Sequence, residues 1–381
     1  MHLSAVSVSA VSEVETIEVV SVTYSAVEAT TMRHFRYLIL VLISTSLGCT
    51  ADNWESRIDE QLSAYKSPQP GIALRIIDGD EVRLERTIGF AVVGTEVPVT
   101  ANTNFRLASI TKHFTALSIL LLIDEGKLEF DTTLASILPE FPSYAEDITI
   151  RQLLQHQAGL PDYEPLVPDG TVPRVRDREV VNLLIQQSSL DFAPGSQYYY
   201  SNSAYAVLAI IVEELSGLTF EEFLRARIFE PSNMNNTVAL VEGINTVPSR
   251  AMGHTVLDGS IEETDQSDFS AVLGDGGIYS SLEDMTTWVE HDFGKQLLSP
   301  ASYQAIFIPD RENYGLGWRI DEFSGHVRYH HSGSTRGFRN FIAHLPDSDI
   351  TLILLSNRGA PDVKPLGEAI LDEYLKHRAS N

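Results

Sequence analysis

The stretch Phe105-Arg-Leu-Ala-Ser-Ile-Thr-Lys112 leads into a strongly apolar run from Ile110 to Ile123. A run of this length and composition predicts a buried helix that ends near Gly126. Ser109 and Lys112 are three positions apart, so on a helix their side chains share one face and lie one turn apart. A hydroxyl beside an amine is a nucleophile beside a base, and the N–H groups at a helix N-terminus stabilise an oxyanion. The stretch therefore predicts an enzyme that acylates its own serine.

The tetrapeptide pattern alone is not specific, because the chain carries a second copy at Ser63-Ala-Tyr-Lys66. This copy closes a short amphipathic segment and runs directly into Ser67-Pro68-Gln69-Pro70, which favours a solvated helix end for Lys66. Ser109 therefore needs partners elsewhere in the chain before a catalytic interpretation is favoured.

Composition restricts the partners of the chain. Its 381 residues are 43% hydrophobic and 21% charged, as in an ordinary globular protein of one or two domains. The formal net charge of −25 argues against nucleic acid and other polyanions as partners. The single cysteine excludes an intramolecular disulfide, and the absence of any run of about 20 apolar residues argues against a membrane-spanning helix.

Residues near the N-terminus resemble an export signal. Met32-Arg-His-Phe-Arg36 is basic, residues 37–44 are mostly apolar, and Ser46-Leu-Gly-Cys49 resembles a bacterial lipobox. Residues 1–31 contain no Lys or Arg, which is not how export signals begin. We therefore expect an upstream extension over 1–31 with the true start at Met32, followed by a lipoprotein-type signal peptide over 32–48.

The lipobox resemblance implies that Cys49 is lipidated and becomes the mature N-terminus. The chain would then be exported to the periplasmic side or the cell surface of a bacterium, and would touch membrane only through that anchor. Thr50, rather than aspartate, follows the cysteine, which favours the outer membrane in a Gram-negative cell. The alternative is an ordinary signal peptide with an incidental cysteine.

Strand patterns stand at both ends of the remaining chain. An amphipathic helix over 53–66 precedes a hairpin, in which residues 70–77 and 81–88 flank an Asp-Gly-Asp turn. The last third predicts four strands and a closing helix, over residues 314–320, 327–331, 338–345, 350–355 and 363–377.

The middle of the chain, roughly residues 130–265, is helical and rich in loops. Thr149-Ile-Arg-Gln152 is a capping box with Gly159 as a helix stop, residues 204–215 follow helical spacing, and a further capping box begins at Thr219. The order predicts an α+β fold, with one antiparallel sheet built from both chain ends, flanked by helices, and a mostly helical insertion. We expect a single catalytic unit over 49–381, with sheet regions of about 67–130 plus 270–381 and a helical region of about 131–269.

Two further segments offer partners for Ser109. In Tyr198-Tyr-Tyr-Ser-Asn202, an extended segment would place Tyr200 and Asn202 on the same side. The Tyr200 phenol could then carry a proton, and the Asn202 amide could orient the amine of Lys112. His331-Ser-Gly333 is predicted to end a strand, and Gly333 lets a ligand approach the backbone closely. The N–H of Ser334 would then be a second oxyanion donor, opposite that of Ser109.

Ser-x-x-Lys, Tyr-x-Asn and His-x-Gly, in this order and at these separations, resemble the serine β-lactamase and penicillin-binding-protein superfamily. The Tyr-x-Asn variant is similar to that of the class C β-lactamases and of the related D-alanyl-D-alanine carboxypeptidases, esterases and D-aminopeptidases. The likeness runs from about residue 67 to residue 376, and includes the segments Gln155-His-Gln-Ala-Gly-Leu-Pro-Asp-Tyr163 and Gly276-Gly-Ile-Tyr-Ser-Ser281. It implies a β-lactamase/transpeptidase-like fold.

The resemblance also implies an acyl-enzyme mechanism. Ser109 would be the nucleophile and Lys112 the base that takes its proton, a role that requires a neutral amine. Tyr200 would protonate the leaving group and then activate the water that removes the acyl group. Asn202 would position the substrate and Lys112, and the N–H groups of Ser109 and Ser334 would form the oxyanion hole.

Two further assignments follow from the resemblance by position: Tyr163 would line the substrate cleft, and Asn357 would be a polar residue on the substrate side. No metal and no cofactor is implied, and the substrate would be a small molecule or a short peptide. Where classical β-lactamases have a lysine, this chain has His331, which is mostly neutral near pH 7. That difference suits esters, small amides or D-amino-acid peptides at least as well as β-lactams.

Other readings are less consistent with the sequence. The Gly-x-Ser-x-Gly pentapeptide of α/β-hydrolases and the His-Glu-x-x-His motif of zinc peptidases are both absent. The alternative to an enzyme is a non-catalytic surface lipoprotein of the same fold that binds peptidoglycan or a partner. The intact set of Ser109, Lys112 and Tyr200 argues against it.

Overall fold

The structure is a computed structural model, which describes residues 4–6, 19–21 and 53–380. Residues Asp52–Asn381 form one compact unit, and Met1–Ala51 form a second. In the second unit the described residues are β1 (Ser4–Val6) and β2 (Val19–Ser21), which pair antiparallel. The predicted start at Met32, the signal segment 32–48 and the lipidation site Cys49 lie outside the described residues.

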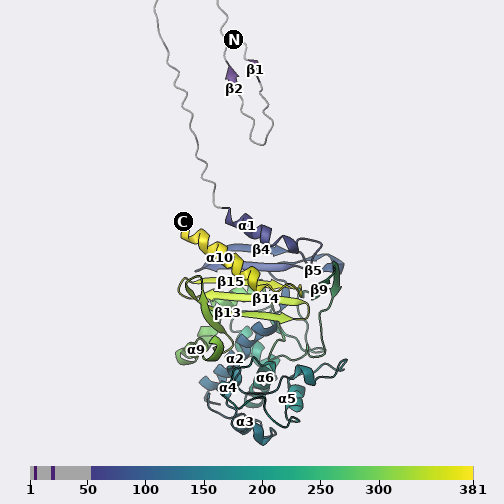
Figure 1. Cartoon of the computed structure of the whole chain (residues 1–381), viewed down its shortest axis with the longest axis vertical. Coiled ribbons are helices and arrows are strands. Elements are labelled where there is room, and N and C mark those ends of the chain that lie inside the picture. The colour runs from purple at the N-terminus through teal and green to yellow at the C-terminus, as the bar shows by residue number, and fades with distance from the viewer. Residues whose placement is uncertain (1–3, 7–18, 22–52, 381) are drawn as a thin grey trace, which may run out of the picture. The chain divides into compact units, whose positions relative to one another are not determined.

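A six-stranded antiparallel sheet forms the centre of the larger unit, in the order β12-β13-β14-β15-β3-β4 (Figure 1). Its strands are β3 (Ile72–Asp78), β4 (Glu81–Ile88), β12 (Arg319–Phe323), β13 (His326–Thr335), β14 (Phe338–Leu345) and β15 (Ile350–Ser356). Strands β3 and β4 form the predicted hairpin, and β15 pairs with β3 along its whole length. The prediction of an α+β fold with one sheet built from both chain ends is therefore confirmed.

Helices cover both faces of this sheet, because strand residues alternate between two hydrophobic clusters. On β15, Ile353 and Leu355 pack into the cluster on the side of the helical region, whereas Leu352 and Leu354 pack into the cluster on the opposite side. That opposite face is covered by α1 (Trp54–Gln61) and α10 (Lys364–Ser380), the first and last helices of the unit (Figure 1).

The remaining helices lie mainly on the other side of the sheet (Figure 1). They are α2 (Thr111–Asp124), α3 (Leu134–Ile137), α4 (Ile150–Leu154), α5 (Asp177–Leu184), α6 (Asn202–Ser216), α7 (Phe220–Leu224), α8 (Leu282–Glu290) and α9 (Pro300–Ile306). Short strands form three smaller sheets: β7 (Asn104–Arg106), β11 (Ile278–Ser281) and β8 (Val238–Ala239); β9 (His254–Leu257) and β10 (Ser260–Glu263); and β5 (Phe90–Val92) and β6 (Val97–Pro98).

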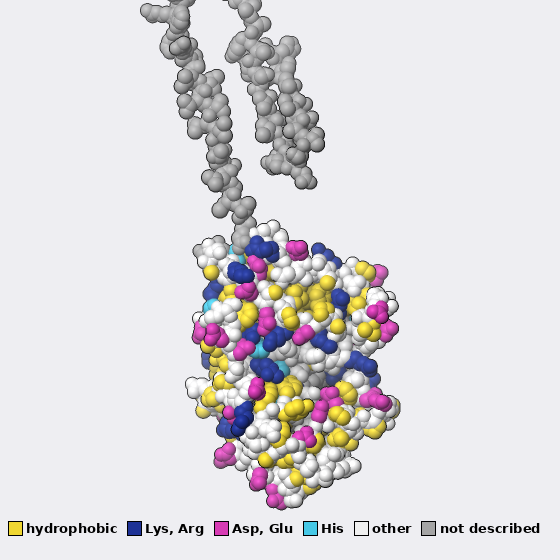
Figure 2. Space-filling model, viewed as in Figure 1, with side chains coloured by type: hydrophobic (Ala, Val, Ile, Leu, Met, Phe, Trp, Pro, Cys, Tyr) yellow, Lys and Arg dark blue, Asp and Glu magenta, His cyan; other side chains and the backbone are white. Residues whose placement is uncertain are grey.

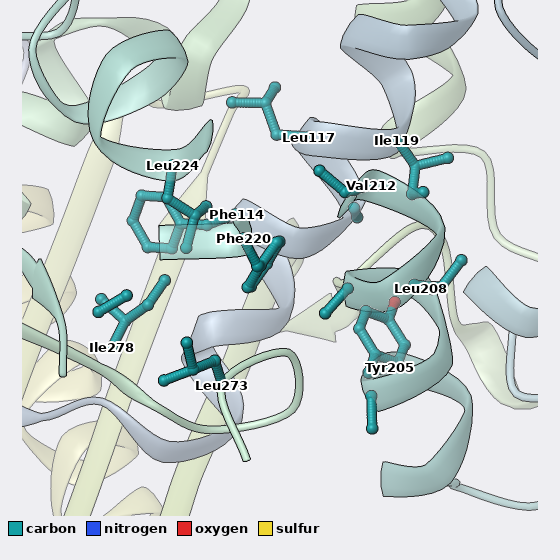
Figure 3. Packing of buried hydrophobic residues seen from close by; sticks show 14 of the residues in the cluster. Phe114, Leu117, Ile119, Tyr205, Leu208, Val212, Phe220, Leu224, Leu273 and Ile278 are labelled. Atoms are coloured by element: carbon teal, nitrogen blue, oxygen red, sulfur yellow. The ribbon is translucent and has the colours of Figure 1, made fainter. Parts of the chain in front are cut away.

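Helix α2 is the central helix of the unit and carries the predicted catalytic pair at its start. Every residue from Thr111 to Leu122 is buried, which explains why its sequence is largely apolar and has no solvent-facing polar side. Phe114 and Leu117 lie beside residues of α6 and α7 in the same cluster, including Val212 and Phe220 (Figure 3). This packing fixes the helix N-terminus, and with it Ser109, against the rest of the core.

Residues in the left-handed backbone conformation shift the ends of two predicted elements. Helix α4 ends at Leu154 rather than near Gly159, because His156 adopts the left-handed backbone conformation with φ +58°. The strand predicted over 314–320 begins only at Arg319, since Gly317 at φ +79° turns the preceding segment. The capping boxes predicted at Thr149 and Thr219 are both present.

On the face in Figure 2, acidic and basic side chains are intermixed rather than gathered by sign. Over residues 53–380 no single helix is long and apolar enough to cross a membrane. One pair of helices, residues 202–216 and 220–229, is long and apolar enough only when the two are taken together, and the pair is bent by 78°.

Candidate active site

Ser109 lies in a single 3-10 turn, Ala108–Ile110, that leads directly into α2. Ala108 has φ +50°, a left-handed conformation that costs a non-glycine residue roughly 1–2 kcal/mol. The backbone before it is held in place, because the N–H of Leu107 donates to the carbonyl of Ile278, 2.8 Å away. The nucleophile predicted from sequence is therefore presented on a constrained turn, as functional residues often are.

Lys112 is fully buried and its Nζ lies within hydrogen-bonding distance of three oxygens. Nζ is 3.2 Å from Ser109 Oγ, 2.8 Å from Asn202 Oδ1 and 3.0 Å from the carbonyl oxygen of Asp275. The two acceptors, Asn202 Oδ1 and the Asp275 carbonyl oxygen, therefore orient the amine beside the Ser109 hydroxyl.

Asn202 extends this chain of contacts by one further residue. It is the first residue of α6, not the end of an extended segment as predicted, because Ser201 caps the helix by accepting from the Ala204 N–H at 3.1 Å. Its Nδ2 donates to Glu164 Oε1 over 2.9 Å. Ser109, Lys112, Asn202 and Glu164 are thus connected in series by hydrogen bonds.

A cavity of about 40 Å³ opens beside Ser109, room for roughly a few water molecules. Ser334, which is exposed, lines it together with the nucleophile, so the two predicted oxyanion donors belong to one cavity. Tyr163 also lines it, although its side chain is buried; its contact with substrate stays a prediction. The full lining is Arg106, Ala108, Ser109, Tyr163, Glu164, Asn202, Phe269, Asp275, Gly276, Ser334 and Thr335.

Two carboxyl groups face this cavity. Asp275 is buried and accepts a hydrogen bond from Tyr163 Oη over 2.9 Å, and burial raises its pKa while the nearby Lys112 opposes the rise. Burial also raises the pKa of Glu164, with Asp162 and Asp275 adding to the effect. Arg106 lies on the same wall and donates to the carbonyl oxygens of Gly276 and Ser270, each over 3.0 Å.

Tyr200 approaches the lysine through its ring rather than through its hydroxyl. The Lys112 Nζ is 4.9 Å from the ring centroid, and the Arg319 guanidinium lies 5.6 Å from the same centroid. The Tyr200 hydroxyl is buried and has no hydrogen-bond partner among the described residues. Its role as a proton carrier remains a prediction.

The side chain of His331 is not brought to the cavity. Strand β13 continues past the predicted end at Gly333 to Thr335, and His331 points into a buried aromatic cluster, with Nε2 3.2 Å from Tyr314 Oη. Burial, with the nearby His113 and Lys112, holds the pKa of His331 well below its usual value. The expectation of a neutral side chain fits this burial, but a side chain within this cluster does not line the cavity beside Ser109.

Gly333 and Asn357 have structural neighbours instead of the ligand contacts expected for them. A Cβ at Gly333 would lie 2.0 Å from the Leu107 carbonyl oxygen, so the close approach is to the turn before Ser109, not to a ligand. Asn357 is fully buried, accepts from the Gly71 N–H over 2.7 Å and donates to the carbonyls of Ala91 and Met252. Its prediction as a substrate-side residue is wrong, because its polar atoms tie loops to the end of β15.

Glu164, Asp275 and Arg106 are site residues that the sequence did not single out. Each adjoins a segment that was quoted: Glu164 follows Tyr163, Asp275 precedes Gly276, and Arg106 lies in the opening octapeptide. An isolated charged residue beside a motif has no periodic signal of its own. Only the chain folding around α2 brings these three side chains to one cavity.

An antiparallel sheet flanked by helices, with a serine and a buried lysine one turn apart at the start of the central helix, is the arrangement of the active-serine β-lactamase and penicillin-binding-protein class. The chain belongs to the beta-lactamase family, whose model matches residues 56–375. The superfamily resemblance predicted from the three motifs is therefore confirmed.

The curated relatives include penicillin-binding protein 4* of Bacillus subtilis (strain 168), which is 30% identical over 302 residues, covering 74% of this chain and 66% of that protein. A D-aminopeptidase of Gluconobacter oxydans (strain 621H) is 27% identical over 321 residues, covering 81% of this chain and 60% of that protein. The chain thus spans less than two thirds of the length of either relative.

Among solved structures, the D-amino acid amidase of Ochrobactrum anthropi SV3, crystallised with L-phenylalanine amide, matches with a TM-score of 0.72 at 23% identity. The match covers 86% of this chain and 99% of that one. At this identity the likeness concerns the fold alone.

Proposed function

We propose that the protein is a serine hydrolase that forms an acyl-enzyme on Ser109. The observation that carries the proposal is the 3.2 Å contact between Ser109 Oγ and Lys112 Nζ, with the amine held by Asn202 and Asp275. A nucleophile next to a base that is itself oriented by further groups is the arrangement of nucleophilic catalysis. The neighbouring cavity gives a substrate carbonyl a place to meet the serine.

In the first half of the reaction Ser109 Oγ attacks the carbonyl carbon and its proton passes to Lys112. The negative charge on the former carbonyl oxygen is stabilised by the N–H groups of Ser109 and Ser334. The bond to the leaving amine or alcohol then breaks as that group takes up a proton, which leaves an ester on Ser109. Tyr200 is the proposed carrier of this proton, and its ring lies 4.9 Å from the Lys112 amine.

In the second half a water molecule gives one proton to the base and its oxygen attacks the ester carbon. The ester bond breaks, the acid is released, and Ser109 recovers its proton. The overall reaction consumes one water for each substrate, and the chain's own residues supply every acid and base. Ester, D-amino-acid amide or peptide, and β-lactam substrates all contain the carbonyl that this sequence of steps requires.

Relatives named D-aminopeptidase and penicillin-binding protein favour a substrate related to D-amino acids. The burial and neutrality of His331 weaken the case for a β-lactam, because no permanent cation stands at the position where classical β-lactamases anchor the substrate carboxylate. The second candidate, a non-catalytic surface protein of this fold that binds peptidoglycan or a partner, does not explain why a lysine is buried against Ser109. Export and lipidation at Cys49 remain part of the proposal.

The proposal is tested by covalent labelling. Wild type and Ser109→Ala are incubated with a fluorescent penicillin and with a fluorophosphonate, and the intact mass is measured. We expect an adduct on the wild type with at least one probe and none on the variant. Ser63→Ala is the matched control, because it removes the serine of the second Ser-x-x-Lys copy and should label like the wild type.

The pattern of labelling also separates the substrate classes. Labelling by the fluorophosphonate alone would favour an esterase or peptidase over a β-lactamase or penicillin-binding protein. A wild type that gains no adduct on Ser109 with either probe would contradict the enzyme and favour the binding protein. Lipidation is tested separately, by the mass of the mature N-terminus in wild type and in Cys49→Ala.

A further inference from the structure

Asp177, the first residue of α5, carries a buried carboxyl group that the hydrolysis steps do not use. Its two oxygens accept from two consecutive backbone N–H groups: Oδ2 from Leu273 over 2.8 Å and Oδ1 from Gly274 over 2.9 Å. A carboxylate has two acceptor oxygens, whereas an amide has only one and would turn its own donor toward the second N–H. A carboxylate therefore suits this pair of contacts in a way that an amide side chain does not.

The segment that this carboxylate holds leads directly to the buried lysine. The carbonyl oxygen of Asp275, the residue after Gly274, accepts from Lys112 Nζ over 3.0 Å. The Gly274 carbonyl accepts from Thr115 Oγ1 over 2.7 Å, and Thr115 lies three residues after Lys112 on α2. Residues 273–275 are thus joined to α5 through two of their N–H groups and to α2 through two of their carbonyls.

Close packing against α6 also holds this segment. An added Cβ at Gly274 would lie 2.3 Å from the Tyr205 carbonyl oxygen and 2.7 Å from the Ala209 Cβ, and both of these residues belong to α6. The backbone at Gly274 therefore lies directly against the helix. Contact with α6 and hydrogen bonds to α5 and α2 together fix the Asp275 carbonyl relative to the amine that it orients.

Asp177 reaches the active site only through this segment. Neither Asp177 nor Leu273 lines the cavity beside Ser109, and both line a separate cavity of about 370 Å³. Asp275, two residues further along, does line the cavity beside Ser109. The segment thus connects a carboxyl group outside the catalytic cavity to the amine beside the nucleophile.

We propose that Asp177 is a positioning residue that holds the 273–275 segment and, through it, the amine of Lys112. This inference rests on the proposed acyl-enzyme function and adds a residue to it. Without the carboxylate the amine keeps its bond to Asn202, but its second acceptor, the Asp275 carbonyl, is no longer fixed. Misplacement of a reacting group by about 1 Å costs roughly 10²-fold in rate, so the loss belongs to the acylation step.

The test compares fluorophosphonate labelling of Ser109 in wild type, Asp177→Asn and Asp284→Asn, with urea unfolding of each. Asp284 is the matched control, because it is also a buried carboxyl group in the first turn of a helix, α8. It accepts from the Asn236 N–H over 2.8 Å and from Thr237 Oγ1 over 2.7 Å, and neither partner belongs to the 273–275 segment.

The expected loss is in the labelling rate at saturating probe. At about pH 8, Asp177→Asn should lower this rate about 10- to 100-fold and leave the half-saturating probe concentration within threefold of wild type. Asp284→Asn should stay within threefold of wild type in both quantities, although it also loses hydrogen bonds to a buried carboxylate.

A pH profile distinguishes positioning from a general loss of stability. Burial raises the pKa of Asp177 to about 7; Asp275 and Glu213 add to the rise and the two N–H groups oppose it. These two acids and the phenol of Tyr163 are the titratable groups that face Asp177. The ionised form makes the stronger pair of hydrogen bonds, so the ratio of wild-type to Asp177→Asn labelling rates should rise from about pH 5.5 to about pH 8.

The contribution of Asp177 to stability changes in the opposite direction, because a raised carboxyl pKa stabilises the fold at low pH and loses this effect as the pH rises through 7. A loss of labelling caused only by weaker folding would follow the stability. A ratio of labelling rates that is constant with pH, or that falls as the pH rises, would therefore contradict the positioning role.

A second variant tests the same segment if Asp177→Asn does not fold. Thr115→Val removes the hydroxyl that donates to the Gly274 carbonyl, with little change in shape. The loss of one hydrogen bond on this segment should lower the labelling rate about 3- to 10-fold. In that case, labelling of Thr115→Val at the wild-type rate would overturn the inference.

Two further results would overturn the inference while leaving the acyl-enzyme intact. One is a folded Asp177→Asn that labels within threefold of wild type at about pH 8. The other is an equal loss of labelling in Asp177→Asn and Asp284→Asn, which would show a general effect of destabilisation. Absence of labelling on Ser109 in the wild type would instead reject the proposed function, and the inference with it.

Discussion

Replacing Gly333 with alanine tests how the sheet positions the nucleophile. A Cβ at this position would lie 2.0 Å from the Leu107 carbonyl oxygen, and close but ordinary contacts begin at 3.4 Å. The backbone must therefore separate by about 1.4 Å at this point. Strand β13 is held by β12 on one side and β14 on the other, so we expect the turn at Leu107 to move rather than the strand.

Because Leu107 is only two residues before Ser109, a displacement of this size reaches the catalytic pair. Misplacement of a reacting group by about 1 Å costs roughly 10²-fold in rate, and overpacking in a core typically costs about 1–3 kcal/mol of stability. We expect the rate of fluorophosphonate labelling in Gly333→Ala to fall about 100-fold, while the protein remains folded.

The assay measures the second-order labelling rate constant at Ser109, together with urea unfolding of each variant. Gly94→Ala is the matched control, because an added Cβ there meets nothing within 4 Å and its φ is not positive. That control should label within twofold of wild type. A folded Gly333→Ala that labels within threefold of wild type would refute the claim that this contact positions the serine.

Four other variants test separate parts of the account. Lys112→Ala should reduce acylation about 10²–10⁴-fold if the amine is the base, and a change below threefold in the labelling rate would remove it from that role. Phe114→Ala should lower the free energy of unfolding by about 3–5 kcal/mol in urea, because its ring is fully buried at the centre of α2. Burial holds the pKa of His113 well below 6.5, so its contribution to stability is lost as the pH falls below 6.5, at roughly 1.4 kcal/mol per pH unit. His113→Phe should remove that share of the slope, and an unchanged slope would contradict the burial of a neutral imidazole. Burial raises the pKa of Asp177 to about 7, so its contribution is present below pH 4 and lost as the pH rises through 7. The difference in unfolding free energy between wild type and Asp177→Asn should therefore change between pH 4 and pH 7, and a constant difference would disprove the shift.

Local patterns predicted much of the fold. The hairpin of β3 and β4, helix α2 and the capped helices each have a periodicity or a capping residue that operates within a few neighbouring positions. The contacts of Lys112 with Ser109 and Asn202 join segments far apart in the chain, which no local pattern can predict. They were expected because the order of the motifs resembles that of a known family.

Other features depend on contacts between distant segments and had no local signal. The end of α4 depends on the left-handed conformation of His156. Its ring Nδ1 accepts a hydrogen bond from the N–H of Ser201, in the segment that contains Tyr200. Asn357 was expected at the substrate because of its position near a strand end. Its amide instead forms hydrogen bonds with backbone groups of the surrounding loops. Glu164 became recognisable only when folding placed its carboxylate beside Asn202.

The central claim is that Ser109 becomes acylated with Lys112 as its base. The most direct measurement is peptide mapping of the labelled protein by mass spectrometry, after a short incubation with the fluorophosphonate and an acid quench. We expect an adduct confined to Ser109, absent from Ser109→Ala and reduced at least about 100-fold in rate in Lys112→Ala. An adduct on another residue, or equal labelling rates in wild type and Lys112→Ala, would contradict it.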